Sequence, residues 1–265
     1  MIFNNKKRFY QIGNLLGFIG TLVVNALANI LPINGKTTGE LSDSYPNLFV
    51  PAGFVFSIWG IIYLLLFLFV LYQGRDLLKK DVEPTPFLNE INGFFILASL
   101  ANMGWIFAWH YELVLLSLVI MAVLLFALLA IYLRLRIGQE KVPREEKILV
   151  HLPFSVYLGW ITIATIANVT AFLVDINWDG FGLSQVFWTY FVIIVAIILT
   201  ALILFTRKDI AYAAVVIWAS YGIYAKQITQ NFAVAVIALI AVTIVSVLIL
   251  ITIIIEIRNK EYLNP

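Results

Sequence analysis

The sequence predicts an all-α, polytopic integral membrane protein, a helical bundle of eight transmembrane helices. Of its 265 residues, 62% are hydrophobic and 12% are charged, and the mean hydropathy is +0.98. Soluble globular domains carry about 25% charged residues, so lipid must cover most of this surface. The apolar runs are long and continuous, unlike the alternating pattern of a membrane β-barrel. The bilayer core has no water to pair with backbone N–H and C=O groups, so such runs form helices, which satisfy these groups internally.

Eight apolar runs are long enough to cross the hydrocarbon core, which takes about 20 helical residues. Glycine, proline and charged residues separate these runs. They lie near 11–32, 51–73, 91–109, 113–135, 150–174, 186–206, 210–227 and 231–257. The first run follows a basic patch, but its length and the lack of a small-residue cleavage site predict a retained helix rather than a cleaved signal peptide.

The positions of the cations predict that both termini are cytoplasmic. With the N-terminus inside and the spans alternating, 15 of the 17 Lys and Arg residues fall on the cytoplasmic side. Only Lys36 and Lys226 fall outside, as the positive-inside rule requires. We expect a multi-pass protein of the plasma membrane, and the Ile-, Lys- and Asn-leaning composition favours a bacterial one.

Residues that usually carry catalysis or ion transport are scarce. Charged side chains at mid-depth of the spans, which mark ion paths, are absent, and this disfavours proton-coupled transport. The chain has no cysteine and no recognised hydrolase or phosphate-binding motif, so neither an enzyme nor a metal site is predicted. His110 and His151 fall at opposite ends of the spans, and we expect both to be interfacial polar residues. Axial haem ligation by His110 is the alternative.

Aromatic and amide side chains recur every three or four residues along four spans, so each set occupies one helix face. An amide in hydrocarbon is costly unless it is hydrogen-bonded, and we therefore expect these faces to point toward one another. The sets are Asn14, Thr21, Asn25 and Asn29; Phe56, Trp59, Tyr63 and Phe67; Ala98, Asn102, Trp105 and Trp109; and Tyr157, Trp160, Ala164, Thr165, Asn168 and Phe172.

Two interpretations of these faces are open. Small residues and amides can serve only to hold helices together, as Gly13 and Gly17 of the first span would. Alternatively, the faces line a cavity for a flat, largely apolar ligand. Spacing alone favours the first interpretation. Trp109 and Trp178 are expected to be interfacial belt residues.

Three segments resemble motifs of the TspO/MBR family, also called translocator protein or tryptophan-rich sensory protein. PAGFVFSIWGIIY, residues 51–63, resembles the second-helix motif P-P-x-W-V-x-x-x-W-x-x-L-Y. LANMGWIFAW, residues 100–109, is similar to the third-helix L-x-L-N-W-x-W, and LPFSVYLGWITIATIAN, residues 152–168, resembles the fifth-helix P-Y-L-x-W-x-x-F-A-T-x-L-N. Order and spacing also agree, and the resemblance covers about residues 11–175.

The resemblance implies a TspO-like five-helix membrane core, residues 1–175, around a ligand cavity. Residues 176–265 would then form a three-helix C-terminal membrane extension. Family members bind tetrapyrroles, sterols and synthetic aromatic ligands, often as dimers. The residues expected to bind ligand here are Asn25, Phe56, Trp59, Tyr63, Asn102, Trp105, Tyr157, Trp160, Asn168 and Phe172.

The function implied is that of a membrane receptor or carrier for a hydrophobic aromatic ligand, in a sensory or transport role. A haem or porphyrin would be such a ligand, while no resident cofactor is expected. Expected partners are the lipid bilayer, a hydrophobic small molecule and a second copy in a homodimer, but no nucleic acid. A facilitative small-molecule transporter and a porphyrin-modifying membrane enzyme are the alternatives.

Departures from the family motifs predict a shift in ligand class. Phe172 stands where the family has a fifth-helix tryptophan, one of a pair implicated in porphyrin photochemistry in some bacterial members. Met103 replaces the first tryptophan of the third-helix motif, and Gly53-Phe54 replaces P-x-W in the second.

Overall fold

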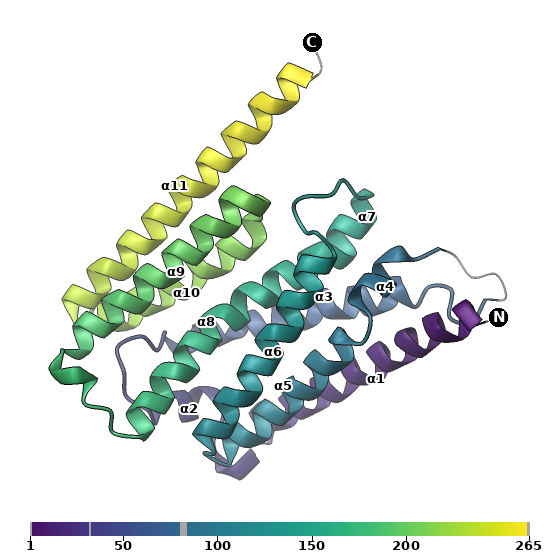
Figure 1. The fold of residues 1–265 in the computed structure, drawn as a ribbon. Helices are drawn as coiled ribbons and strands as arrows, with labels where there is room; N and C mark the ends of the chain where they lie inside the picture. Colours follow the sequence, from purple (N-terminus) through teal and green to yellow (C-terminus); the bar gives the residue numbers. More distant parts are fainter. Residues whose placement is uncertain (1, 32, 80–83, 264–265) are drawn as a thin grey trace.

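The structure is a computed structural model that describes residues 2–31, 33–79 and 84–263. Within these ranges the chain is helical, and no strand occurs. Eight long helices lie at the eight predicted runs (Figure 1). They are α1 (Ile2–Ile30), α3 (Ile58–Gln73), α5 (Phe94–His110), α6 (Val114–Arg134), α8 (Leu152–Asp175), α9 (Gln185–Arg207), α10 (Ile210–Gln227) and α11 (Phe232–Leu263).

Six helical stretches of the described chain are long and apolar enough to cross a membrane, so the protein is a multi-pass membrane protein. They are Asn5–Ile30, Gly53–Gln73, Val114–Arg134, Arg144–Asp175, Gln185–Arg207 and Phe232–Asn259. Helix α5 is apolar but has only 17 residues, and α10 ends in Lys226 and Gln227. Crossing by these two helices, and the orientation of the termini, stay predictions.

Short elements connect the long helices. They are η1 (Ile33–Gly35), α2 (Thr38–Asp43), η2 (Gly53–Ser57), α4 (Pro86–Ile91), α7 (Arg144–Glu146), the single π-turn η3 (Lys147–His151) and η4 (Gly180–Gly182). Helix α2 begins at a capping box, in which the Thr37 hydroxyl accepts from the Glu40 amide and the Glu40 carboxylate accepts from the Thr37 amide. This arrangement satisfies two backbone donors that a helix start would leave unpaired.

Helix α1 lies against α5 along a row of glycines. A Cβ added at Gly13 would lie 2.5 Å from Ile96, one at Gly17 would lie 2.9 Å from the Ser99 hydroxyl, and one at Gly20 would lie 2.8 Å from the Met103 sulfur. The small-residue face predicted for the first span is therefore the face that meets α5. Close backbone approach of this kind stabilises helix pairs in lipid through van der Waals packing.

Two of the predicted inward positions face outward. Asn29 is exposed, and its amide donates to the carbonyl of Asn25 on its own helix. Phe67 is 46% exposed and contacts Phe18 of α1 at the rim of the bundle. A hydrogen bond within the same helix satisfies an amide without a partner helix, and an aromatic ring needs no polar partner in lipid.

The last three helices pack together, with α11 on the outer side (Figure 1), and α10 joins them to the rest of the bundle. Gly222 of α10 comes so close to η2 that an added Cβ would lie 2.0 Å from Val55 Cγ2. The Gly222 carbonyl accepts from the Ala52 amide at 3.0 Å, and the Trp218 indole donates to the Val55 carbonyl at 3.0 Å. Through these contacts of Gly222 and Trp218, helix α10 packs on the segment that enters α3.

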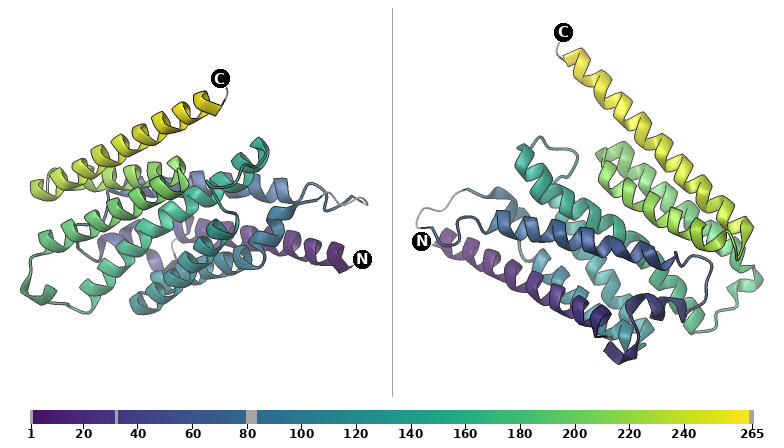
Figure 2. Two further views of the ribbon diagram at one scale, coloured as in Figure 1. Left: turned by 45° about the horizontal axis from the view of Figure 1, so that its top comes forward. Right: turned by 180° about the vertical axis from the view of Figure 1, so that it is seen from behind.

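Figure 2 shows the C-terminal part of α11 extending beyond its neighbours.

Candidate functional site

A small cavity of about 50 Å³, the core chamber, lies among α3, α5 and α8 beneath α2. Its walls are mainly aromatic, with Asn168 as the amide side chain among them. The lining residues are Thr38, Ser42, Pro51, Phe56, Trp59, Trp105, Trp109, Trp160, Ile163, Ala164, Ala167 and Asn168. The aromatic faces predicted on three separate helices therefore do meet at one cavity.

The rings of the core chamber pack in two groups. Trp59 stacks on Tyr63 with ring centroids 5.5 Å apart, and it meets Trp160 edge-on at 6.1 Å. Trp105 and Trp109 stack at 5.8 Å with nearly parallel planes on α5. Offset and edge-on contacts of this kind hold rings in fixed positions, so the chamber presents rigid indole surfaces.

Two buried donors at or beside the chamber have no hydrogen-bond partner among the residues that the structure describes. They are the indole N–H of Trp160, whose side chain is 3% exposed, and the hydroxyl of Tyr63. A buried polar group without a partner costs about 1–3 kcal/mol. By contrast, the Trp105 indole donates to Asn168 Oδ1 at 2.9 Å, and Asn168 Nδ2 donates to Ser117 Oγ at 3.0 Å. Trp160 is therefore a lining residue with a buried indole N–H that has no partner among the described residues.

A second polar cluster lies outside the lining and links three helices. Asn25 Nδ2 donates to Asn102 Oδ1 at 2.7 Å, and Asn102 Nδ2 donates to the Tyr157 hydroxyl at 2.9 Å. All three side chains are buried. This relay joins α1, α5 and α8, and Tyr157 contacts the chamber residue Trp59 edge-on at 6.0 Å.

The structure therefore divides the ten residues predicted to bind ligand. Five line the core chamber, namely Phe56, Trp59, Trp105, Trp160 and Asn168. Asn25, Asn102 and Tyr157 form the relay, and Tyr63 supports Trp59 from behind. Phe172 packs against the core without lining the chamber.

The side chains of Trp109, His110 and His151 are all buried, so Trp109 is not an exposed belt residue, whereas the interfacial depth expected for the two histidines stays a prediction. Trp109 is 5% exposed, and its indole donates to the Thr38 carbonyl at 3.4 Å. His110 Nε2 lies 3.1 Å from the Thr38 hydroxyl, and its Nδ1 lies 2.9 Å from the Ile33 carbonyl. Both ring nitrogens of His110 thus have hydrogen-bond partners within the protein, and axial haem ligation would require one of these contacts to break. His151 is buried within the π-turn.

Sequence reasoning missed the cover of the chamber because its residues belong to a short element with no periodic pattern. Thr38 and Ser42 of α2 line the chamber, and the Trp109–Thr38 and His110–Thr38 contacts hold α2 on α5. The T-x-x-E sequence at Thr37 and Glu40 was the available signal, since it is typical of a helix start. The capping hydrogen bonds lower the pKa of Glu40 below its usual 4.5.

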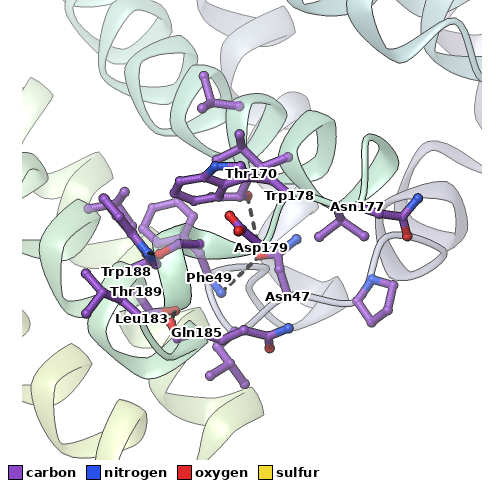
Figure 3. A pocket seen from close by; sticks show the side chains of 17 residues that line it. Asn47, Phe49, Thr170, Asn177, Trp178, Asp179, Leu183, Gln185, Trp188 and Thr189 are labelled. Carbon is purple, nitrogen blue, oxygen red and sulfur yellow. Dashed lines mark hydrogen bonds between the residues drawn. The ribbon is translucent and has the colours of Figure 1, made fainter.

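A larger cavity of about 500 Å³, the α8–α9 pocket, lies between the end of α8, the start of α9 and the loop before η2 (Figure 3). Its lining includes Phe49, Trp178, Asp179, Gln185 and Trp188. Trp178, expected from the sequence to be a belt residue, is half-buried and lines this pocket. Its depth in the membrane stays a prediction.

Tyr45 lies near the carboxylates of Glu112 and Asp175. The residues that follow it, 46–49, line the α8–α9 pocket. Its ring contacts Trp109 at 5.5 Å. Burial, followed by the nearby carboxylates of Glu112 and Asp175, raises the pKa of Tyr45 to about 12. A phenol that is buried beside carboxylates resists ionisation.

Comparison with known families gives a match to the family described as TSPO-like protein, over residues 11–254. The match covers α9, α10 and most of α11 as well as the segments that carry the motifs. No curated protein and no solved structure matches the chain.

Proposed function

The chain belongs to the TSPO-like protein family, and we propose that it is a membrane receptor or carrier that binds a hydrophobic aromatic ligand in the core chamber. The observation that carries the proposal is a cavity with aromatic walls, one lining residue of which, Trp160, has a buried indole N–H without a partner. A flat ligand with one acceptor would stack on the indoles and accept from this N–H, which removes the cost of burying the donor alone. A tetrapyrrole such as haem or a porphyrin has this chemistry.

Ligand entry requires the chamber to widen. Pockets for drug-sized ligands measure about 300–1,000 Å³, whereas the core chamber is about 50 Å³. The cover consists of the six-residue α2 and the segment that contains Pro51. Side-chain contacts to Trp109 and His110 hold α2 in place. We propose that α2 moves outward when ligand binds, and that α3, α5 and α8 keep the indoles fixed.

The test is quenching of tryptophan fluorescence in the purified protein by protoporphyrin, by haem and by a sterol. The variants are Trp160→Phe, which keeps an aromatic ring but removes the donor, and Trp178→Phe, a matched control in the other pocket. We expect saturable quenching by a tetrapyrrole and an affinity lower by about three- to tenfold in Trp160→Phe, as the loss of one hydrogen bond predicts. The same loss in Trp178→Phe, or no saturable quenching, would contradict the proposal.

The receptor or carrier role proposed here involves no covalent chemistry. Counterflow of the bound ligand in proteoliposomes would favour the facilitative transporter instead, and formation of a product under light or oxygen would favour the porphyrin-modifying enzyme. Homodimer formation, a bacterial plasma membrane and cytoplasmic termini also stay predictions. Thiol labelling of single cysteines in whole cells can test the orientation directly, because the chain has no native cysteine.

A further inference from the structure

We propose that the α8–α9 pocket is a second binding site, separate from the core chamber, and that it takes a small alkylated ammonium group. Its volume of about 500 Å³ lies within the range of small-molecule sites. None of the residues that line it also lines the core chamber.

Two indoles form the aromatic wall of this pocket. The rings of Trp178 and Trp188 lie 4.9 Å apart at an interplanar angle of 57°, so the two faces are inclined to each other. The Trp188 indole donates to the Gly180 carbonyl at 3.0 Å, which fixes the turn that carries Trp178 and Asp179. Gly180 has a φ of +67°. Glycine adopts this left-handed conformation readily because it has no Cβ. The wall is therefore held in place before any ligand arrives.

One carboxylate accompanies the indoles, and no lysine or arginine is among the described residues that line the pocket. Asp179 accepts a hydrogen bond from the Phe181 amide through Oδ1, and it forms no ion pair with any described residue. Figure 3 shows Asp179, Trp178 and Trp188 at the same pocket. Indole faces attract cations through their quadrupole, and the carboxylate adds an attraction of the same sign.

The surrounding charges favour a cation as well. The segments at this end of the bundle carry five carboxylates, from Glu40, Asp43, Glu112, Asp175 and Asp179, against the two lysines Lys36 and Lys226, a net formal charge of −3. Both lysines are already paired, Lys36 with Glu112 at 3.4 Å and Lys226 with Asp43 at 2.6 Å. A field of one sign raises the local concentration of counter-ions, and it disfavours phosphate or carboxylate ligands.

A neutral apolar ligand would contact the indoles but would gain no attraction from Asp179, whose carboxylate is exposed to water. An alkylated ammonium satisfies both, because its methyl groups bury apolar surface against the rings while its charge lies near the carboxylate. The same group occurs in soluble amines and in the choline headgroup of lipids. The pocket lies at the ends of α8 and α9, where a membrane-spanning helix meets water, so both sources can reach it.

The test uses the full chain with 5-fluorotryptophan incorporated, in a maltoside detergent, followed by ¹⁹F NMR. Choline is titrated against its neutral isostere 3,3-dimethylbutan-1-ol at constant ionic strength. We expect choline to shift the Trp178 and Trp188 resonances saturably, with an affinity at least about fivefold above that of the isostere. The resonances of Trp59 and Trp105 in the core chamber should not move. Equal responses to the two probes, or no saturable shift, would overturn the proposal.

Variants test the individual groups. Asp179→Asn is expected to weaken choline binding by about two- to fivefold, the range for an exposed ion pair, and Trp178→Leu by about threefold or more. The matched control Asp175→Asn removes a carboxylate at the same end that does not line the pocket. An equal loss in Asp175→Asn would show a general field effect and overturn the site. Repeating the titration in phosphatidylcholine and in phosphatidylglycerol nanodiscs distinguishes a soluble amine from a lipid headgroup as the ligand. If the ligand is the choline headgroup, phosphatidylcholine will block the response to added choline and phosphatidylglycerol will not.

Discussion

The core chamber and the α8–α9 pocket differ in how their residues are positioned. Most of the chamber lining comes from long helices, at positions that recur every three or four residues, and its volume is about 50 Å³. The α8–α9 pocket takes much of its lining from a turn and a loop, and its volume is about 500 Å³. In the core chamber, helical periodicity therefore positions closely packed indoles. The larger α8–α9 pocket forms where the chain reverses direction between two helices.

The largest expected effect comes from breaking the relay behind the core chamber. Asn102→Leu removes the partner of the Tyr157 hydroxyl and the interhelical partner of Asn25, whose Nδ2 keeps only its bond to the Thr21 carbonyl. We expect the substitution to lower the free energy of unfolding by about 2–4 kcal/mol. Thermal unfolding in detergent measures this. Asn29→Leu is the matched control, since that exposed amide bonds only to its own helix, and its effect should be within about 0.5 kcal/mol. Similar losses in both variants would mean that the hydrogen bonds between helices in the relay add no more stability than a bond within helix α1.

A smaller effect is expected at the contact between α10 and η2. Gly222→Ala would place a Cβ 2.0 Å from Val55 Cγ2, and the branched valine has little room to turn. We expect a loss of about 1–3 kcal/mol from overpacking, again measured by thermal unfolding.

Gly60→Ala in α3 is the control for this substitution, because an added Cβ there meets no atom within 4 Å. It should be neutral or stabilising by about 0.5–1 kcal/mol, as expected for a glycine inside a helix. A neutral Gly222→Ala would show that α10 packs loosely on the segment that enters α3.

The smallest expected effect concerns pH and the cover of the chamber. The pKa of Glu40 is lowered in the folded state by its bonds to Thr37. Its contribution to α2 is therefore complete above its usual pKa of 4.5 and is lost as the pH falls through the lowered value. We expect the protection factors of the α2 amides, corrected for the intrinsic pH dependence of hydrogen exchange, to fall on acidification to below pH 4.5, with little change at η4. Glu40→Gln should remove this pH dependence, and an unchanged profile in that variant would contradict the assignment.

Much of the fold could be predicted because lipid imposes a simple rule on sequence. Long apolar runs form helices, and the aromatic positions Trp59, Trp105 and Trp160 face one another as their spacing indicates. Trp109, His110 and α2 could not be placed, because burial at the end of a span depends on how a connecting segment folds back. Asn29 faced outward because a bond to its own helix replaces a partner helix. The α8–α9 pocket could not be predicted either, because it depends on the turn at Gly180, where the sequence has no repeating pattern of apolar residues.

The most direct measurement of two separate sites is ligand protection of single thiols, because the native chain has no cysteine. Ser42→Cys places a thiol at the core chamber and Gln185→Cys places one at the α8–α9 pocket. We expect protoporphyrin to change maleimide labelling of the Ser42→Cys variant alone, and choline to slow labelling of the Gln185→Cys variant alone. Protoporphyrin protection of the Gln185→Cys thiol without any effect at position 42 would contradict the account, because the aromatic ligand would then occupy the α8–α9 pocket instead of the chamber.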